Sequence, residues 1–137
     1  MNLREKLKEL ENETDRIQLE NEFLEFLKSS STYDQLRFID ETGMELTRVN
    51  YNRGNPSVTE KSGLQDKSSR YYFQESIVLP EGSIYVSPFD LNVERGKIEI
   101  PLKPMIRFGT PVFSKDGKTK GIVILNFLGQ LLIDDLA

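Results

Sequence analysis

The segment SSRYYFQES (68–76) places an arginine just ahead of aromatic side chains. Arg70 is followed by Tyr72 and Phe73. A guanidinium can hold a carboxylate or a similar acceptor through two parallel hydrogen bonds, and aromatic rings beside it exclude water. The pattern therefore predicts a binding site for a small molecule that carries an acceptor group. The alternative is an exposed arginine at the start of a helix beside two core aromatics, and the sequence leaves both open.

Polar residues within strand-like segments are further candidates for the same site. Tyr85 and Ser87 stand two apart, so their hydroxyls share one face of a strand. Ordinary strand packing would explain them equally well. Arg107 lies in an otherwise apolar stretch, so it either faces solvent or reaches a pocket. Arg48 is expected to be a cross-strand residue at the surface.

The amino-acid composition removes most catalytic chemistry. The 137 residues include no cysteine and no histidine, which excludes thiol nucleophiles, imidazole bases, disulfides and His or Cys metal ligands. A small hydrolase built on Asp and Tyr would need a nucleophile–base pair, and none is visible. Asp134 and Asp135 have no third oxygen ligand at motif spacing, so we expect neither a metal nor a cofactor. Asp and Glu outnumber Lys and Arg by 22 to 18, which argues against nucleic acid as a partner.

A long N-terminal helix is expected over residues 1–31. Residues 2–30 contain neither Gly nor Pro and are rich in good helix formers. Apolar residues recur along it at heptad-like spacing, with two polar positions in the series: Leu3, Leu7, Leu10, Ile17, Leu24 and Leu27, with Thr14 and Asn21. Phe23 and Phe26 widen this stripe. Such a helix needs a partner surface, so it either packs on its own domain or pairs, through its first half, with the same helix of a second subunit.

After residue 32 the pattern changes to strand-like alternation. Residues 33–40 and 44–51 alternate on either side of a turn at Gly43, which predicts a β-hairpin. Leu36 and Phe38 should lie on one face of the first strand, with Arg37 and Ile39 on the other.

The remaining elements are a loop, short helices and three more strands. We expect a long surface loop at 52–69, a short helix at 70–79, strands at 84–92, 97–114 and 121–129, and a helical segment at 130–137. Prolines in the second of these strands favour an edge or bent position, and the apolar third strand is expected to be central. The order predicts an α+β domain with a five-stranded, mostly antiparallel sheet and short helices on one face.

Three segments in this order resemble the extracytoplasmic PAS-like sensors called Cache or PDC domains. YDQLRFIDETGMELTRVN (33–50) resembles their opening hairpin, and SSRYYFQES resembles their Arg-x-aromatic-aromatic segment. IYVSPFDLN with PMIRFGTPVFSKDGKTKGIVILNF (104–127) resembles their last strands. The closest resemblance is to the membrane-distal module of double-Cache sensors on histidine kinases and diguanylate cyclases. It implies a signalling and dimerisation helix at 1–31, a PAS-like sensor module at 32–137, and a ligand pocket between the sheet and the loop–helix face.

The chain differs from the amino-acid-sensing members that it resembles. In those, a Trp follows the Arg by two positions and aspartates on later strands hold the ligand's ammonium; the corresponding residues here are Tyr72, Ser87 and Asn126. Because a buried amine needs a carboxylate, the implied ligand is a small anionic or neutral molecule. The residues implied to bind it are Arg70, Tyr72, Phe73, Tyr85, Ser87, Arg107 and Asn126.

The resemblance implies an extracytoplasmic ligand-sensing domain of a membrane receptor of the sensor histidine kinase type, which is not itself an enzyme. Its N-terminal helix would relay ligand occupancy, and the expected partners are a small molecule and a second copy of the chain. No apolar run reaches the about 18 residues of a membrane helix, so membrane segments are expected outside this chain. The alternative is a ligand-free structural module that dimerises through the helix.

Overall fold

The computed structural model describes residues 13–29, 33–91, 93–100 and 104–129. Its helices and strands follow one another in this order: α2 (Glu13–Lys28), β1 (Tyr33–Asp40), β2 (Glu45–Asn50), 3-10 helix η1 (Asn52–Gly54), β3 (Ser57–Val58), 3-10 helix η2 (Lys61–Gly63), α3 (Tyr71–Ile77), β4 (Tyr85–Val86), β5 (Asp90–Leu91), β6 (Val93–Glu94), β7 (Lys97–Ile98), β8 (Pro104–Phe113) and β9 (Thr119–Leu128). The predicted hairpin and the predicted short helix are both present. The segment at 130–137 and residues 1–12 lie outside the described residues.

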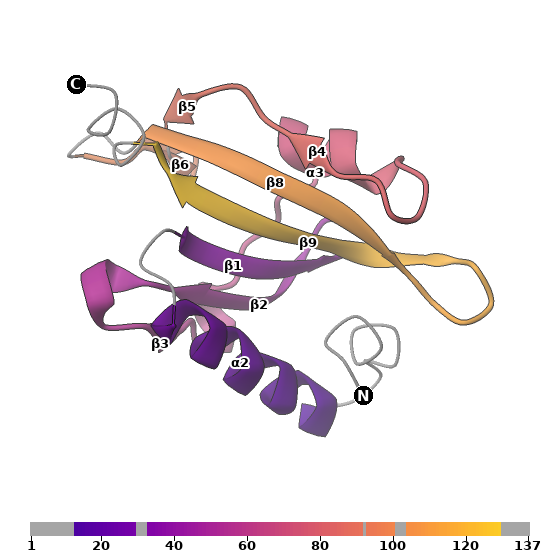
Figure 1. Ribbon diagram of the computed structural model, residues 1–137, viewed down its shortest axis with the longest axis horizontal. Helices are drawn as coiled ribbons and strands as arrows, with labels where there is room; N and C mark the ends of the chain where they lie inside the picture. The colour runs from indigo at the N-terminus through magenta and orange to yellow at the C-terminus, as the bar shows by residue number, and fades with distance from the viewer. Residues whose placement is uncertain (1–12, 30–32, 92, 101–103, 130–137) are drawn as a thin grey trace.

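Seven strands form one antiparallel sheet in the order β3-β2-β1-β9-β8-β4, with β5 also on β8 (Figure 1). β6 and β7 pair with each other in a separate two-stranded sheet. The α+β class is confirmed, and β9 is central as predicted. The sheet has seven strands rather than five because 84–92 forms two short strands and the loop contributes β3. β8 is not an edge strand, since β4 and β5 pair with it on the side away from β9. Pro111 is tolerated because it lies past Gly109, where the pairing with β4 ends.

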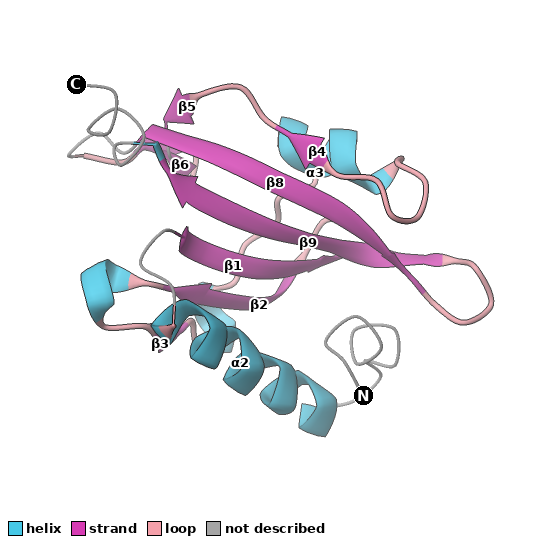
Figure 2. Cartoon of the chain, in the orientation of Figure 1, coloured by secondary structure: helices cyan, strands magenta, loops and turns pink. Residues whose placement is uncertain are grey.

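Helix α2 packs on the sheet of its own domain. Leu19, Phe23 and Leu27 are buried against Leu36 and Phe38 of β1. Of the predicted stripe, Leu27 is therefore in the core and Leu24 packs against it, whereas the side chain of Ile17 is 49% exposed. Figure 2 shows α2 beside β1, β2 and β3, at the opposite end of the strand order from α3. Leu3, Leu7 and Leu10 are outside the described residues, so pairing with a second subunit stays a prediction.

Helix α3 covers the other face of the sheet. Ile39, Ile122 and Ile124 pack against Tyr72 and Phe73 of α3. Since successive residues of a strand point to opposite faces, β1 presents Leu36 and Phe38 to α2 but Arg37 and Ile39 to α3. The division of these four residues between two faces is the one that the sequence predicts. The face towards α3 is the one that carries the polar residues discussed below.

The turn between β1 and β2 fixes where α3 begins. Asp40 Oδ1 accepts hydrogen bonds from the backbone N–H groups of Thr42 (2.8 Å) and Met44 (3.1 Å). Gly43 has φ +96°, and a Cβ built there would lie 2.5 Å from Cα of Ser68. The Lys67 N–H donates to the Gly43 carbonyl at 2.7 Å. This contact brings the segment before Arg70 against the hairpin, so the loop reaches the polar side of β2.

In the described part of the chain, no helix combines the length and the apolar character needed to cross a membrane.

Candidate functional site

One row of residues across the sheet is polar from β2 to β4. Cross-strand pairing joins Asn50 to Gln35, Gln35 to Asn126, and Asn126 to Arg107. Ser87, directly after β4, continues the row: its N–H donates to the Arg107 carbonyl at 2.9 Å, and its Oγ accepts from the Arg107 N–H at 2.7 Å. Paired residues share a face, so these side chains all point to the α3 side of the sheet.

Side-chain amides within this row bond to one another. Gln35 Nε2 donates to Asn50 Oδ1 at 2.8 Å, and Asn126 Nδ2 donates to Gln35 Oε1 at 3.2 Å. Arg37, in the next row, donates from Nη2 to Asn126 Oδ1 at 3.2 Å. The three central amides are therefore fixed in orientation, and they form a rigid polar floor.

A buried ion pair lies next to the amide row. The side chains of Arg37 and Glu45 are 3% and 0% exposed, and Arg37 Nη1 lies 3.3 Å from Glu45 Oε2. Glu45 Oε1 accepts from the Gln65 N–H at 2.9 Å and lies 3.7 Å from Arg48 Nη1. Burial alone would lower the pKa of Arg37, but its attraction to Tyr72 and Glu45 outweighs burial and raises the pKa. Glu45 thus joins β1, β2 and the loop before α3.

The ring of Tyr72 is surrounded by guanidinium groups. Those of Arg37, Arg70 and Arg107 lie 4.9, 5.4 and 5.0 Å from its centroid. The Tyr72 hydroxyl accepts from Arg37 Nη1 at 2.8 Å. Burial would raise the pKa of the Tyr72 phenol, but the charge of Arg37 and its hydrogen bond lower it instead. Burial and repulsion from Arg37 lower the pKa of Arg107. The region around Tyr72 therefore carries an excess of positive charge.

Arg107 has a carboxylate partner at its outer end. Its Nη1 lies 3.5 Å from Asp90 Oδ2, and the Tyr71 hydroxyl donates to the same oxygen at 2.7 Å. Arg107 also donates to the Tyr71 oxygen at 3.2 Å. Partial burial opposes ionisation of Asp90, but the hydrogen bond from Tyr71 and the neighbouring cations outweigh it and lower the pKa of Asp90. Burial, followed by this hydrogen bond to Asp90, raises the pKa of Tyr71.

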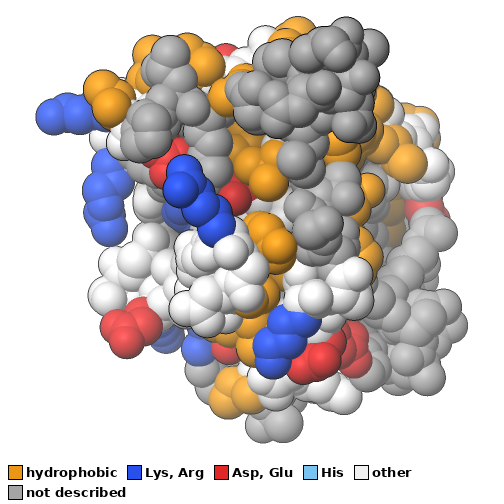
Figure 3. Space-filling model, turned by 60° about the vertical axis from the view of Figure 1, so that its left-hand side comes forward, with side chains coloured by type: hydrophobic (Ala, Val, Ile, Leu, Met, Phe, Trp, Pro, Cys, Tyr) orange, Lys and Arg blue, Asp and Glu red, His pale blue; other side chains and the backbone are white. Residues whose placement is uncertain are grey.

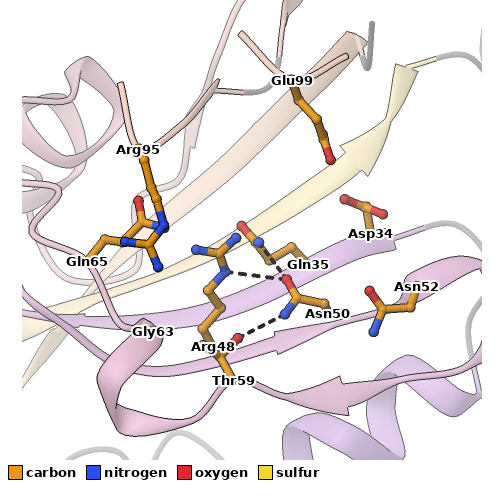
Figure 4. A pocket seen from close by; sticks show the side chains of 10 residues that line it. All are labelled: Asp34, Gln35, Arg48, Asn50, Asn52, Thr59, Gly63, Gln65, Arg95 and Glu99. Carbon is orange, nitrogen blue, oxygen red and sulfur yellow. Dashed lines mark hydrogen bonds between the residues drawn. The ribbon is translucent and has the colours of Figure 1, made fainter. Parts of the chain in front are cut away.

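A cavity of about 390 Å³ opens above the β2 end of the polar row (Figure 4). Gln35, Arg48 and Asn50 form its floor, and Figure 4 shows Arg95 and Glu99 reaching towards it from the opposite side. Its lining is almost entirely polar: Asp34, Gln35, Arg48, Asn50, Asn52, Thr59, Gly63, Gln65, Arg95 and Glu99. The cavity can therefore hold a small polar molecule.

A second cavity, of about 650 Å³, adjoins the first because both are lined by Gln65 and Arg95. Its lining is mixed: Leu64, Gln65, Asp66, Lys67, Ser69, Arg70, Val93, Arg95, Gly96 and Ile98. Figure 3, which brings the β5–β6 end of the molecule forward, shows Lys and Arg side chains beside hydrophobic ones on this face. We call the two together the paired cavities.

Of the seven predicted ligand residues, Arg70 lines one of the paired cavities. Five others are buried in the packed network around Tyr72 or beside it: Tyr72, Phe73, Ser87, Arg107 and Asn126. Tyr85 is partly buried and packs against the Tyr72–Phe73 cluster. The structure brings most of these side chains onto one face. Ligand contact by the seven stays a prediction.

The prediction that Arg48 lies at the surface is wrong. Its exposed fraction is 8%, and it lines the smaller cavity. Glu45, Gln65 and Arg95 were not predicted as site residues, and neither were Gln35 and Asn50. A local signal existed for Gln35, since it shares the inward face of its strand with Arg37 and Ile39.

Among the described residues, Asp and Glu do not gather in groups of three or more that could hold a metal ion.

Residues 5–137 match the sequence model of a family described as bacterial histidine kinase, sensor domain. No curated protein sequence matches the chain.

The fold is similar to those of solved sensor domains. A domain of a protein assigned to the sensory box/GGDEF family from Vibrio parahaemolyticus is 24% identical with a TM-score of 0.84, over 96% of this chain and 49% of that one. The extracellular domain of a protein assigned as the histidine kinase vpHK1S-Z8 is 24% identical with a TM-score of 0.85. The match covers 96% of this chain and 47% of that one. The ligand-binding domain of the Campylobacter jejuni chemoreceptor Tlp3, in complex with L-valine, is 15% identical with a TM-score of 0.68, over 95% and 50%. The chain thus spans about half the length of these structures.

Proposed function

The chain belongs to the family of bacterial histidine kinase sensor domains, and from this premise we propose that it binds a small polar ligand in the paired cavities and reports its presence to the rest of a membrane receptor. The receptor is a histidine kinase in this proposal, and the sensor works outside the cytoplasm. A similar fold in a domain described as extracellular supports that location. The whole receptor would be longer than this chain, as its structural neighbours are.

The observation that carries the proposal is the cavity above the polar row. Its volume of about 390 Å³ falls in the range of about 300–1,000 Å³ that is typical of small-molecule sites. Its floor is preorganised, because Asn50 is held by hydrogen bonds from Gln35 at 2.8 Å and Arg48 at 3.4 Å. Preorganised polar groups of this kind fix the orientation of a ligand at little entropic cost.

The charge around the cavities supports an anionic or neutral ligand. Arg48, Lys67, Arg70 and Arg95 line one or the other cavity. Carboxylates are present as well, since Asp34 and Glu99 line the smaller cavity, but each already has another interaction in the fold. A buried ammonium would therefore be poorly compensated. The L-valine bound to Tlp3 makes an amino acid the compound that tests this charge argument most directly, because its ammonium would need a carboxylate.

A second candidate, the ligand-free structural module, is favoured by the packing around Tyr72. Tyr72 and Asn126 are 2% and 0% exposed and bond to Arg37 rather than facing an opening. In this proposal the polar network exists to fix the sheet, and the domain contributes stability and dimer contacts to the receptor through its N-terminal helix.

Ligand screening by thermal unfolding separates the two candidates. A specific ligand at about 100 times its dissociation constant should stabilise the fold by about 2.7 kcal/mol. We expect at least one acid, amino acid or sugar to raise Tm, and the rise to be lost in Arg48→Gln. Lys61→Gln is the matched control, because Lys61 is exposed and lines neither cavity. A broad library that leaves Tm unchanged would support the structural module instead.

A further inference from the structure

The tip of the β6–β7 hairpin holds an arginine in an unfavourable backbone conformation. Glu94 pairs with Lys97, so the turn consists of Arg95 and Gly96, with φ +50° and +79°. Two-residue turns with both φ values positive strongly prefer Asn, Asp or Gly at the first position. Strain of this kind, at a position that other residues would fill more easily, points to a role for the side chain.

The side chain of Arg95 lies where the paired cavities meet. It lines both of them, and it forms no hydrogen bond or ion pair within the part of the chain that the structure describes. Arg70 lines the larger cavity too. Its guanidinium stacks over the rings of Tyr71 and Tyr72, at 5.5 and 5.4 Å, but donates no side-chain hydrogen bond to any described residue. Two guanidinium groups thus border one cavity with their donors available.

The rest of the larger cavity combines a further cation with apolar surface. Lys67 lines it and donates to Gln65 at 2.8 Å. Among the described side chains of this lining, the carboxylate belongs to Asp66, which already accepts the Ser68 N–H at 2.8 Å. Apolar contact is offered by three side chains of this lining: Leu64, Val93 and Ile98. A molecule with an acidic group and a short apolar part would complement both features.

We propose that Arg95 and Arg70 together bind the acidic group of a small organic acid, and that the β6–β7 hairpin therefore determines ligand specificity. This inference rests on the proposed function and adds the chemical class of the ligand. Bidentate hydrogen bonds from the two guanidinium groups hold the acid, and Leu64, Val93 and Ile98 contact its apolar part.

The test uses three variants and six probes on the 137-residue chain. Arg95→Asn removes the charge and inserts a residue that the turn prefers. Arg70→Gln removes the other guanidinium. Lys97→Gln is the matched control, because Lys97 is an exposed cation of the same hairpin that lines neither cavity. Butyrate, benzoate, phenyl phosphate and inorganic phosphate are the acidic probes, with benzamide as the neutral probe and butylamine as the cationic one. Binding is followed by Tm shift and calorimetric titration.

Wild-type protein and Lys97→Gln are expected to bind benzoate or phenyl phosphate. Comparing the affinities for the carboxylate probes with those for the phosphate probes identifies the preferred acidic group. Losing charge-assisted hydrogen bonds should weaken binding about ten- to hundredfold in Arg95→Asn and in Arg70→Gln. Without ligand, Arg95→Asn should unfold at the same Tm as wild type or at a higher one.

Equal affinity of wild type and both arginine variants for the acids would overturn the inference. A lower Tm of ligand-free Arg95→Asn would overturn it too, because it would mean that Arg95 contributes to packing. Binding of benzamide or butylamine, or of a sugar from the broad library, in place of the acids would also overturn it while leaving the proposed function intact. Only a complete absence of binding, in these probes and in the broad library, would remove the proposed function itself.

Discussion

The substitution Glu45→Gln tests whether the buried ion pair holds the site together. Glu45 is fully buried, 3.3 Å from Arg37, 3.7 Å from Arg48 and 2.9 Å from the Gln65 N–H. Gln has nearly the same shape and keeps one acceptor oxygen, so the substitution removes the charge and one of the two acceptors. Arg37 would then remain buried with its positive charge uncompensated.

The expected loss of stability follows from that uncompensated charge. Removing one partner of a buried ion pair costs about 3–5 kcal/mol, and the retained acceptor of Gln places this case near the lower value. For a domain of 137 residues, 1 kcal/mol corresponds to a Tm change of about 4 °C. We therefore expect Glu45→Gln to lower the free energy of unfolding by about 3 kcal/mol and Tm by about 12 °C.

Urea denaturation at 0.1 M and 0.5 M NaCl, followed by circular dichroism, provides the assay. Glu25→Gln is the matched control: Glu25 lies 3.4 Å from Lys28, and the two side chains are 74% and 51% exposed. Surface pairs contribute about 0–1 kcal/mol and are screened by salt, so this control should change little. The effect of Glu45→Gln should persist at the higher salt concentration. In a double-mutant cycle, Arg37→Met and Glu45→Gln should be coupled by about 1–3 kcal/mol.

A loss below about 1 kcal/mol in Glu45→Gln, or strict additivity with Arg37→Met, would refute this reasoning. Either result would mean that the two charges are solvated in the folded state, and that the amide row does not depend on them.

Four further substitutions test the turn, the helix contact and the acidic group beside Arg107. Gly43→Ala should lower the free energy of unfolding by about 2–3 kcal/mol in urea titrations, since φ is +96° and the new Cβ would lie 2.5 Å from Ser68; a loss under about 0.5 kcal/mol would mean that the turn relaxes freely. Phe23→Ala should cost about 3–5 kcal/mol, and Phe26→Ala, whose side chain is 40% exposed, under about 1 kcal/mol; similar losses would argue that α2 does not pack as described. Because the pKa of Asp90 is lowered in the fold, its contribution to stability is present above about pH 4 and is lost as the pH falls through the lowered pKa. The difference in Tm between wild type and Asp90→Asn should accordingly shrink from pH 7 to pH 3, and a constant difference would contradict the assignment.

Local periodicity was sufficient to predict β1 and β9, but the single strand predicted at 97–114 is wrong, because Lys97–Ile98 is β7 of the separate hairpin and β8 begins at Pro104. The alternation in 33–40 places Leu36 and Phe38 opposite Arg37 and Ile39, and the structure has the same arrangement. The strand at 121–129 was predicted to be central from its apolar run alone. These predictions succeed because successive residues of one strand point to opposite faces, so their apolar or polar character indicates which face is buried.

The short strands depend on distant partners, so periodicity does not identify them. Each of β3, β4 and β5 has two residues, too few for an alternating pattern. β3 forms because Val49 and Asn50 of β2 offer a free edge to Val58 and Ser57. The segment 84–92 reads as one strand in sequence, but two short stretches of it pair with β8 instead.

The site was only partly predictable for the same reason. Arg48 reads as a surface residue in an alternating hairpin, since nothing nearby indicates what covers it. Gln65 and Arg95, which line the same cavity as Arg48, lie 17 and 47 positions further along the chain. The burial of Glu45 depends on a distant partner too, because its N–H group donates to the Gln65 carbonyl and its carboxylate accepts from the Gln65 N–H.

The position of α2 favours the paired cavities over the Tyr72 region as the place where occupancy is sensed. Helix α2 contacts β2, β1 and β3, and the first two of these strands supply the floor of the smaller cavity through Gln35, Arg48 and Asn50. Thr59, which accepts from Asn50 at 2.9 Å, follows Val58 in the chain, and Val58 packs against the core that contains α2. A ligand that pulls on this floor therefore moves residues whose neighbours touch the helix on the other face. Such a shift needs two arrangements of the β1–β2–β3 edge that the ligand binds unequally. The Tyr72 region meets this edge at β1, through Arg37 and Ile39, and the other strands that α3 contacts are β4, β8 and β9. A ligand there would therefore act on α2 through one strand of the edge rather than through two.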